Sequence, residues 1–239
     1  IRLIVSDVDE TLADLFLPAS SGMAAELNSL LAEGKSLFLV TGAGFASVKR
    51  RITDLIDPTL RSKVLVSHCS GAEVTGFDAN GEVLEKPHYS LYDETLTPEQ
   101  KARWREIVKQ IIEEFHLDPH PTVPVKEFKE KYGDNPLAIM LDDRGPQITF
   151  EFVNGYRLTT EQIEALRQHM PNFDMADLRV PVMERINELL EEAGVPVTPR
   201  FGGMFALDLA LKGVSKTTSV KHGIENDTVL ASIGLKKED

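Results

Sequence analysis

The chain has 239 residues, of which 42% are hydrophobic and 27% are charged, and its formal net charge is −12. This composition is typical of a folded, soluble protein, and no apolar run reaches the roughly 18 residues that span a bilayer. The acidic excess, without a basic patch, argues against nucleic acid and anionic membranes as partners. The single cysteine, Cys69, cannot form an internal disulfide, which suits a cytoplasmic protein. Its place beside the apolar run 64–66 predicts a thiol packed in the core rather than a nucleophile.

Strand-like and helix-like segments alternate over the first 82 residues, which predicts a parallel sheet with crossover helices. The run 2–6 is nearly all apolar and is expected to be a strand buried on both faces. A helix is predicted at 22–33, where Gly34 ends it. We expect further strands at 36–40 and 63–66, a helix from Phe45, and a hairpin over 72–84 that turns at 78–81.

The pattern changes near Glu85 to a mixture of helices and antiparallel strands. Capping boxes at 97–100 and 159–162 each predict the start of a helix, and an apolar stripe to Leu190 indicates a third. The runs 137–141 and 147–152 are expected to form a hairpin. After residue 199 the sequence is strand-like again over 204–211, and a helix follows Lys216.

Two polar clusters in this region are interpreted without a function. His116, Asp118 and His120 could ligate a metal, but their proline-rich setting favours a loop. A small basic run, formed by Lys126, Lys129 and Lys131, could face a substrate anion, but its alternation with Glu127 and Glu130 favours a solvated helix face.

The fold class that follows is α/β. We expect a Rossmann-like parallel-sheet core with crossover helices, formed by residues 1–84 and 200–239, and an inserted α+β domain of residues 85–199.

Two aspartates, Asp7 and Asp9, follow the first predicted strand in the sequence Asp7-Val8-Asp9-Glu10-Thr11-Leu12. Open α/β sheets bind ligands at the carboxyl ends of their strands. Two adjacent carboxylates repel each other unless a cation neutralises them, and Mg²⁺ is the natural candidate. One aspartate is then able to attack phosphorus while the other handles the proton of the leaving group. The alternative is an acidic loop that caps a helix.

This motif resembles the first motif of the haloacid-dehalogenase-like phosphatases and phosphomutases. The resemblance implies a hydroxyl residue after the second strand and a lysine that opens a late helix, both for phosphate binding. Thr41, followed by Gly42, meets the first expectation, and Lys216 meets the second. A hydroxyl with free backbone N–H groups beside it suits a phosphoryl oxygen. Taken alone, Thr41 would be a helix cap and Lys216 a surface lysine. Ala43 stands where related sequences often have arginine.

The resemblance also implies a Gly-Asp pair and a further aspartate, which complete the magnesium shell after one more strand. No such residues follow Lys216 in the sequence. We expect either that the chain continues beyond Asp239 or that its metal site, with Asp7 and Asp9 alone, has too few ligands for tight binding.

The insertion resembles the large cap of the subgroup that includes sucrose-phosphate, trehalose-phosphate and mannosyl-phosphoglycerate phosphatases and the phosphomannomutases. In that subgroup the cap closes over the substrate and supplies specificity. The implied function is Mg²⁺-dependent hydrolysis of a small phosphate monoester, foremost a sugar phosphate, through an aspartyl-phosphate on Asp7. A phosphomutase and a non-catalytic phosphate-binding or regulatory protein are the alternatives. No pattern in the sequence specifies the alcohol part of the substrate or an oligomeric state.

Overall fold

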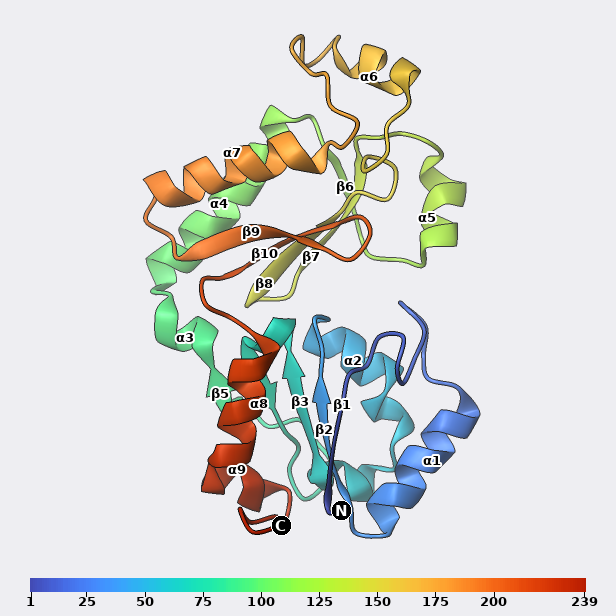
Figure 1. Ribbon diagram of the computed structural model, residues 1–239, viewed down its shortest axis with the longest axis vertical. Helices are drawn as coiled ribbons and strands as arrows, with labels where there is room; N and C mark the ends of the chain where they lie inside the picture. The colour runs from blue at the N-terminus through green and yellow to red at the C-terminus, as the bar shows by residue number, and fades with distance from the viewer. The chain divides into compact units, whose positions relative to one another are not determined.

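The computed structural model describes residues 1–239 and separates them into two compact units. Unit 1 consists of Ile1–Glu94 and Gly213–Asp239, and unit 2 of Thr95–Lys212 (Figure 1). The sequence placed the boundaries about ten residues too early at each crossing. They lie later because one short strand after residue 84 pairs in the sheet of unit 1, and two strands after residue 196 pair in the sheet of unit 2. No helix is both long and apolar enough to cross a membrane.

Unit 1 contains a five-stranded sheet in the order β1-β2-β3-β4-β5. The first three strands run parallel, and β4 and β5 add antiparallel pairs. The strands are β1 (Leu3–Ser6), β2 (Ser36–Val40), β3 (Val64–His68), β4 (Glu73–Thr75) and β5 (Tyr89–Ser90). The helices are α1 (Ser21–Ala32), α2 (Phe45–Arg51), α3 (Leu91–Thr95), α8 (Lys216–Glu225) and α9 (Asp227–Ser232).

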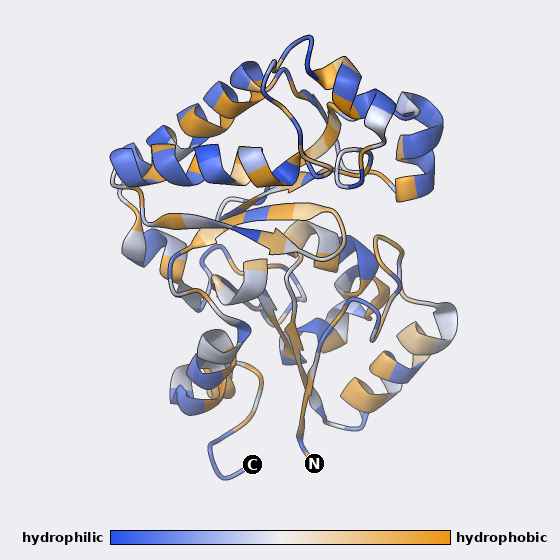
Figure 2. Ribbon diagram, turned by 45° about the horizontal axis from the view of Figure 1, so that its top comes forward, coloured by the Kyte–Doolittle hydropathy of each residue, from blue (hydrophilic) through white to orange (hydrophobic).

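The two faces of this sheet carry separate hydrophobic clusters. Leu37 and Leu39 of β2 point to one face, where they pack in a cluster with residues of α1 and α2. Phe38, between them, points to the other face and packs with residues of α9. In Figure 2 the strands next to the N-terminus are mostly orange, as a sheet covered on both faces requires. The predicted α/β fold with crossover helices is therefore confirmed.

The strand β1 differs from its prediction. All five residues of β2 and of β3 are buried, but the side of β1 that carries Val5 is open, and Val5 is 48% exposed. The reason is the position of β1 at the edge of the sheet, where β2 is its only partner. An apolar run indicated the strand correctly but did not indicate its place in the order.

Unit 2 contains a second five-stranded sheet in the order β6-β7-β8-β10-β9, in which only β6 and β7 run parallel. Helices α4 and α7 pack together on the apolar side, and Trp104 of α4 is fully buried. The strands are β6 (Asp118–His120), β7 (Ala138–Asp143), β8 (Gln147–Glu151), β9 (Val197–Gly202) and β10 (Ala206–Leu211). The helices are α4 (Pro98–Glu114), α5 (Val125–Tyr132), α6 (Thr160–Leu166) and α7 (Arg179–Glu192).

Several local predictions for unit 2 are confirmed. Both capping boxes form, with Thr97 before α4 and Thr159 before α6, and β7 and β8 make the expected hairpin. The lysines at 126, 129 and 131 lie on the short helix α5, as expected.

Two predictions for unit 2 are wrong. Asp118–His120 is a strand rather than a loop, because its backbone pairs with β7 despite the proline at 119. The strand-like run that ends at Leu211 belongs to the inserted unit rather than to the core, because β10 pairs with β8 and β9.

The opposite face of the unit 2 sheet is polar. Asp208 Oδ1 accepts hydrogen bonds from Gln147 Nε2 at 2.9 Å and from Thr149 Oγ1 at 2.7 Å. Glu151, two residues farther along β8, is only 6% exposed. Burial raises the pKa of Glu151 to about 7, while the nearby Arg144 lowers it. A carboxyl group in this position holds its proton up to neutral pH.

Candidate active site

The two aspartates lie in a tight turn directly after β1. The carbonyl oxygen of Val8 accepts hydrogen bonds from Leu12 N at 2.9 Å and from Ala13 N at 3.1 Å, and the Val8 side chain is fully buried. Glu10 has a φ of +57°, which reverses the chain within this turn. Asp7 Oδ1 accepts a hydrogen bond from Val8 N at 2.7 Å. The turn therefore holds both carboxylates at the carboxyl end of the first parallel strand.

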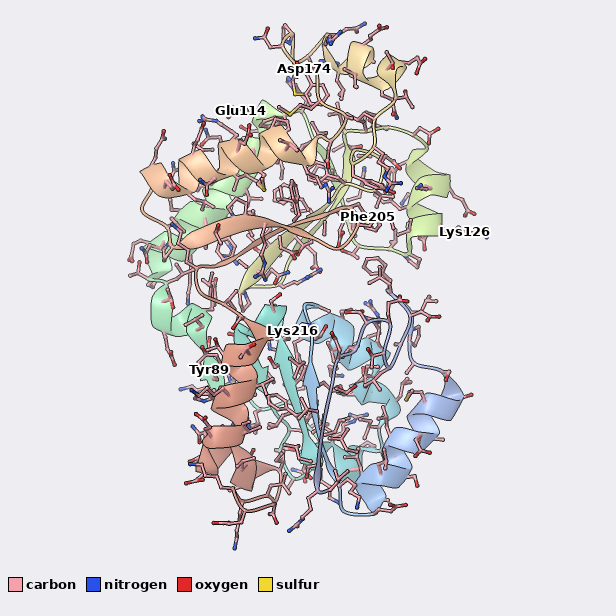
Figure 3. All side chains as sticks on the ribbon, viewed as in Figure 1. Tyr89, Glu114, Lys126, Asp174, Phe205 and Lys216 are labelled. Carbon is pink, nitrogen blue, oxygen red and sulfur yellow. The ribbon has the colours of Figure 1, made fainter.

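Lys216 lies against the first of these carboxylates. Its Nζ is 2.7 Å from Asp7 Oδ2, and the two side chains are 43% and 46% exposed. Lys216 is the first residue of α8, and Figure 3 labels it there. The positive end of the helix dipole disfavours a cation at this position, so the aspartate explains the lysine. An ammonium and a carboxylate that are both open to solvent form a pair that a phosphate group is able to enter.

Two close contacts hold the start of α8 against the end of β3. Ser67 Oγ and Ser219 Oγ are 2.6 Å apart, and both residues are fully buried. Gly71 has a φ of +97°, and a Cβ at this residue would lie 2.3 Å from Ser215 O. Only glycine fits such a close approach, so residue 71 sets the place of the helix that carries Lys216.

Thr41 follows β2 and contacts the second aspartate. Its Oγ1 donates a hydrogen bond to Asp9 Oδ2 at 3.2 Å, and its side chain is fully buried. The N–H groups beside it are less open than the sequence predicts, because Thr41 N donates to Ser67 O and Ala43 N donates to Thr41 Oγ1. The hydroxyl oxygen of Thr41 is therefore held in place by the backbone of its own loop. Gly42 lies between Thr41 and Ala43, and a Cβ at residue 42 would be in ordinary contact with Ser70 Oγ at 3.6 Å.

The loop after β3 completes this end of the sheet. Cys69 N donates to Ala43 O at 2.9 Å, and Ser70 N donates to Thr41 O at 3.0 Å. Cys69 is fully buried, as predicted for a core thiol. His68, at the end of β3, is 3% exposed, and burial lowers its pKa to about 4. The imidazole is therefore neutral at physiological pH.

Arg51 is a residue of this site that sequence reasoning missed. Its Nη1 lies 2.8 Å from Asp9 Oδ1, and its side chain is 2% exposed. The contact is an ion pair rather than an aligned hydrogen bond, since Oδ1 accepts no hydrogen bond of good geometry. In the sequence, Arg51 ends the basic run Lys49-Arg50-Arg51, which is typical of the exposed last turn of a helix. The one signal in the sequence was Ala43, which stands where related sequences often have arginine. Its presence could have suggested that another arginine supplies a guanidinium to the site.

The donor atoms of this site suit a magnesium ion. Asp7 and Asp9 offer carboxylate oxygens, and Mg²⁺ is often bound in proteins through one or two carboxylates together with water and substrate phosphate. The structure contains no group of three or more His, Cys, Asp and Glu side chains arranged to hold a metal. The two aspartates are thus the residues of this site that would hold the ion.

The comparisons with known proteins place the fold. No family model and no curated protein matches the sequence. Among solved structures, a haloacid dehalogenase-like hydrolase from Bacteroides thetaiotaomicron matches with a TM-score of 0.57 and 14% identity over 98% of this chain and 77% of its own. The chain has the haloacid-dehalogenase-like fold. The C-terminal domain of C. albicans trehalose-6-phosphate phosphatase matches with a TM-score of 0.55 and 14% identity over 95% of this chain and 62% of its own.

A third similar structure is an IMP-nucleotidase from Plasmodium falciparum, with a TM-score of 0.51 and 12% identity. The match covers 96% of this chain and 58% of the nucleotidase. The chain therefore spans less than two thirds of two of these relatives. Identities of this size establish the shared fold and leave the chemistry to be argued from the residues.

Within the haloacid-dehalogenase-like fold, the residues singled out from the sequence lie together. Asp7 and Asp9 follow β1, Thr41 and Gly42 follow β2, and Lys216 opens α8. The ion pair of Lys216 with Asp7 and the hydrogen bond of Thr41 with Asp9 join these three segments at one end of the unit 1 sheet. Open α/β sheets bind ligands at this end.

Proposed function

We propose that the chain is a phosphatase that hydrolyses a small phosphate monoester through an aspartyl-phosphate on Asp7, with Mg²⁺ as its cofactor. One observation carries the proposal: the ammonium of Lys216 lies 2.7 Å from an oxygen of Asp7, whose side chain is half exposed. A lysine in this place attracts the phosphate group that the carboxylate is to attack.

In the first step, Asp7 attacks phosphorus in line with the leaving oxygen. The phosphorus–oxygen bond to the alcohol breaks, and Asp9 gives a proton to the departing oxygen. Lys216 neutralises the phosphoryl oxygens during this step, and Thr41 orients the carboxylate of Asp9 through its hydroxyl. Bound Mg²⁺, held by Asp7 and Asp9, would neutralise further charge on the phosphoryl group.

In the second step, water attacks the phosphorus of the aspartyl-phosphate. Asp9, now ionised, takes a proton from this water, and inorganic phosphate leaves while Asp7 regains its carboxylate. The same residue acts as acid and then as base, so a single carboxylate close to Asp7 is sufficient for both transfers.

Sugar phosphates are the substrates that we propose first, with unit 2 as the part that selects among them. The solved trehalose-6-phosphate phosphatase with the same fold supports this choice, as does the resemblance of the insertion to a large cap.

A screen of phosphate monoesters tests the proposal. Release of inorganic phosphate is measured with Mg²⁺ and with a chelator, for the wild type, for Asp7→Asn and for Glu26→Gln, an exposed carboxylate of α1 that serves as the matched control. We expect release by the wild type and the control, and none by Asp7→Asn or with the chelator. Undiminished release by Asp7→Asn refutes the nucleophile. Isomerised sugar phosphate in place of inorganic phosphate would make the enzyme a phosphomutase.

A further inference from the structure

The side chain of Arg51 joins the candidate acid–base residue to a turn at the surface. All three nitrogen atoms of its guanidinium are used. Nη1 contacts Asp9 Oδ1 at 2.8 Å, Nη2 donates to Asp14 O at 2.9 Å, and Nε donates to Leu17 O at 2.8 Å. The backbone of Arg51 adds a fourth contact, because its carbonyl oxygen accepts a hydrogen bond from Ala19 N at 3.0 Å.

The turn that Arg51 holds is apolar and open to solvent. Leu15 and Leu17 are 47% and 46% exposed, and Phe16 between them has a φ of +64°. A bulky residue is strained in this conformation, so the turn depends on contacts from outside it. Leu17 N donates to Asp14 O, and the carbonyl oxygens of both residues accept hydrogen bonds from the Arg51 guanidinium.

The carboxylate of Asp9 is held from both sides. Thr41 Oγ1 contacts one oxygen and Arg51 contacts the other, so the plane of the carboxylate cannot rotate without breaking one of the contacts. Because Arg51 is buried, its guanidinium depends on the oxygen atoms of Asp9, Asp14 and Leu17 around it, and these contacts fix the side chains of Arg51 and Asp9. A proton donor must be held to a fraction of an ångström to act on a leaving oxygen.

We propose that Arg51 is a positioning residue, which locks the carboxylate of Asp9 in its working orientation and couples it to the turn at 14–17. The inference rests on the proposed function for its effect on turnover, but the coupling to the turn is independent of any activity. Arg51 supplies the site with a guanidinium in a sequence that has alanine at 43.

Steady-state kinetics with the phosphate ester found in the screen test the first part. Arg51→Met should lower kcat by about 100-fold and change KM by less than about threefold, because Arg51 orients Asp9 and does not touch the substrate. Arg51→Lys restores the charge near Asp9 and should recover about tenfold of the loss. Arg50→Met, an exposed neighbour on α2, is the matched control and should equal the wild type. In the Asp9→Asn background, Arg51→Met should lower kcat by less than about threefold more. Multiplicative losses, or a loss in KM alone, would overturn the inference.

Limited proteolysis with chymotrypsin tests the coupling without activity. Cleavage within 15–17 should be about tenfold faster in Arg51→Met than in Arg50→Met, and faster in Asp9→Asn than in the wild type, because the carboxylate of Asp9 is a partner of the Arg51 guanidinium that holds the turn. Equal cleavage rates in all variants would contradict the coupling. Where Arg51→Met does not fold, Arg51→Lys and Asp9→Asn decide by the same comparison. A wild type that cleaves no ester refutes the proposed function alone, since the proteolysis still tests Arg51.

Discussion

Gly71 is expected to control the position of Lys216 through its close approach to Ser215. A Cβ at residue 71 would lie 2.3 Å from Ser215 O, whereas ordinary contact begins near 3.4 Å, so Ser215 would move away by about 1 Å in Gly71→Ala. Lys216 follows Ser215 directly and would move with it. A shift of about 1 Å in a reacting or charge-stabilising group costs on the order of 100-fold in kcat.

Gly34→Ala is the matched control for this substitution. Gly34 has a φ of +86°, and no heavy atom lies within 4 Å of its Cβ position. Alanine there is strained by about 1–2 kcal/mol in the backbone alone, whereas Gly71→Ala adds the collision. We expect urea unfolding to show a larger loss for Gly71→Ala, and phosphate-release kinetics to show a fall of about 100-fold in kcat for that variant only. Equal stability and equal turnover in the two variants would refute the role assigned to residue 71.

Three further predictions concern charge. Lys216→Met should lower kcat/KM by about 100- to 1,000-fold. It should change the free energy of unfolding by less than about 1 kcal/mol, because the Lys216–Asp7 pair is half exposed. Lys221→Met on the same helix is the control, and a loss of stability without a loss of turnover would contradict the assignment. The raised pKa of Glu151 means that folded unit 2 keeps a proton that the unfolded chain loses. The stability of unit 2 should therefore fall by roughly 3 kcal/mol as pH rises from 4.5 to about 7. Glu151→Gln should abolish this fall when unfolding is followed by the fluorescence of the only tryptophan. The lowered pKa of His68 gives the opposite pH dependence. The unfolded chain binds a proton that folded unit 1 does not bind, so stability should fall by roughly 3 kcal/mol as pH drops from 6.5 to about 4. His68→Gln should remove that slope when unfolding is followed by exposure of the only thiol, and an unchanged slope would refute it.

The parts of the fold that were predictable are those that short-range patterns determine. The strand Ser36–Val40 agrees with the sequence because a buried parallel strand is a continuous apolar run. The helix start at Phe45 agrees because apolar residues recur at helical spacing after it. Capping boxes at 97 and 159 agree because the cap is made by residues three apart.

Strand order and domain boundaries depend on pairing between distant residues, which no local pattern contains. The exposed side of β1 follows from its place at the sheet edge. Strand β10 joins unit 2 through residues of β8 that lie 55 to 63 positions earlier, and β9 joins through β10. Asp118–His120 forms a strand because β7 is available beside it, although its own composition favours a loop.

The candidate site divides in the same way. Asp7 and Thr41 stand at strand ends, where position in the sequence indicates position in the fold. Arg51 reaches Asp9 by the direction of a side chain that leaves the end of α2 inward, and three neighbouring basic residues look alike in the sequence. Gly71 was missed because its close neighbour, Ser215, lies 144 residues farther along the chain.

Chemical trapping of the intermediate tests the central claim most directly. The protein is mixed with a phosphate ester and Mg²⁺, quenched in acid and reduced with borohydride, which converts an aspartyl-phosphate to homoserine, and the peptides are analysed by mass spectrometry. We predict homoserine at residue 7 in the wild type and none in Asp7→Asn. Phosphate release without modification at residue 7, or modification at another aspartate, would contradict Asp7 as the nucleophile.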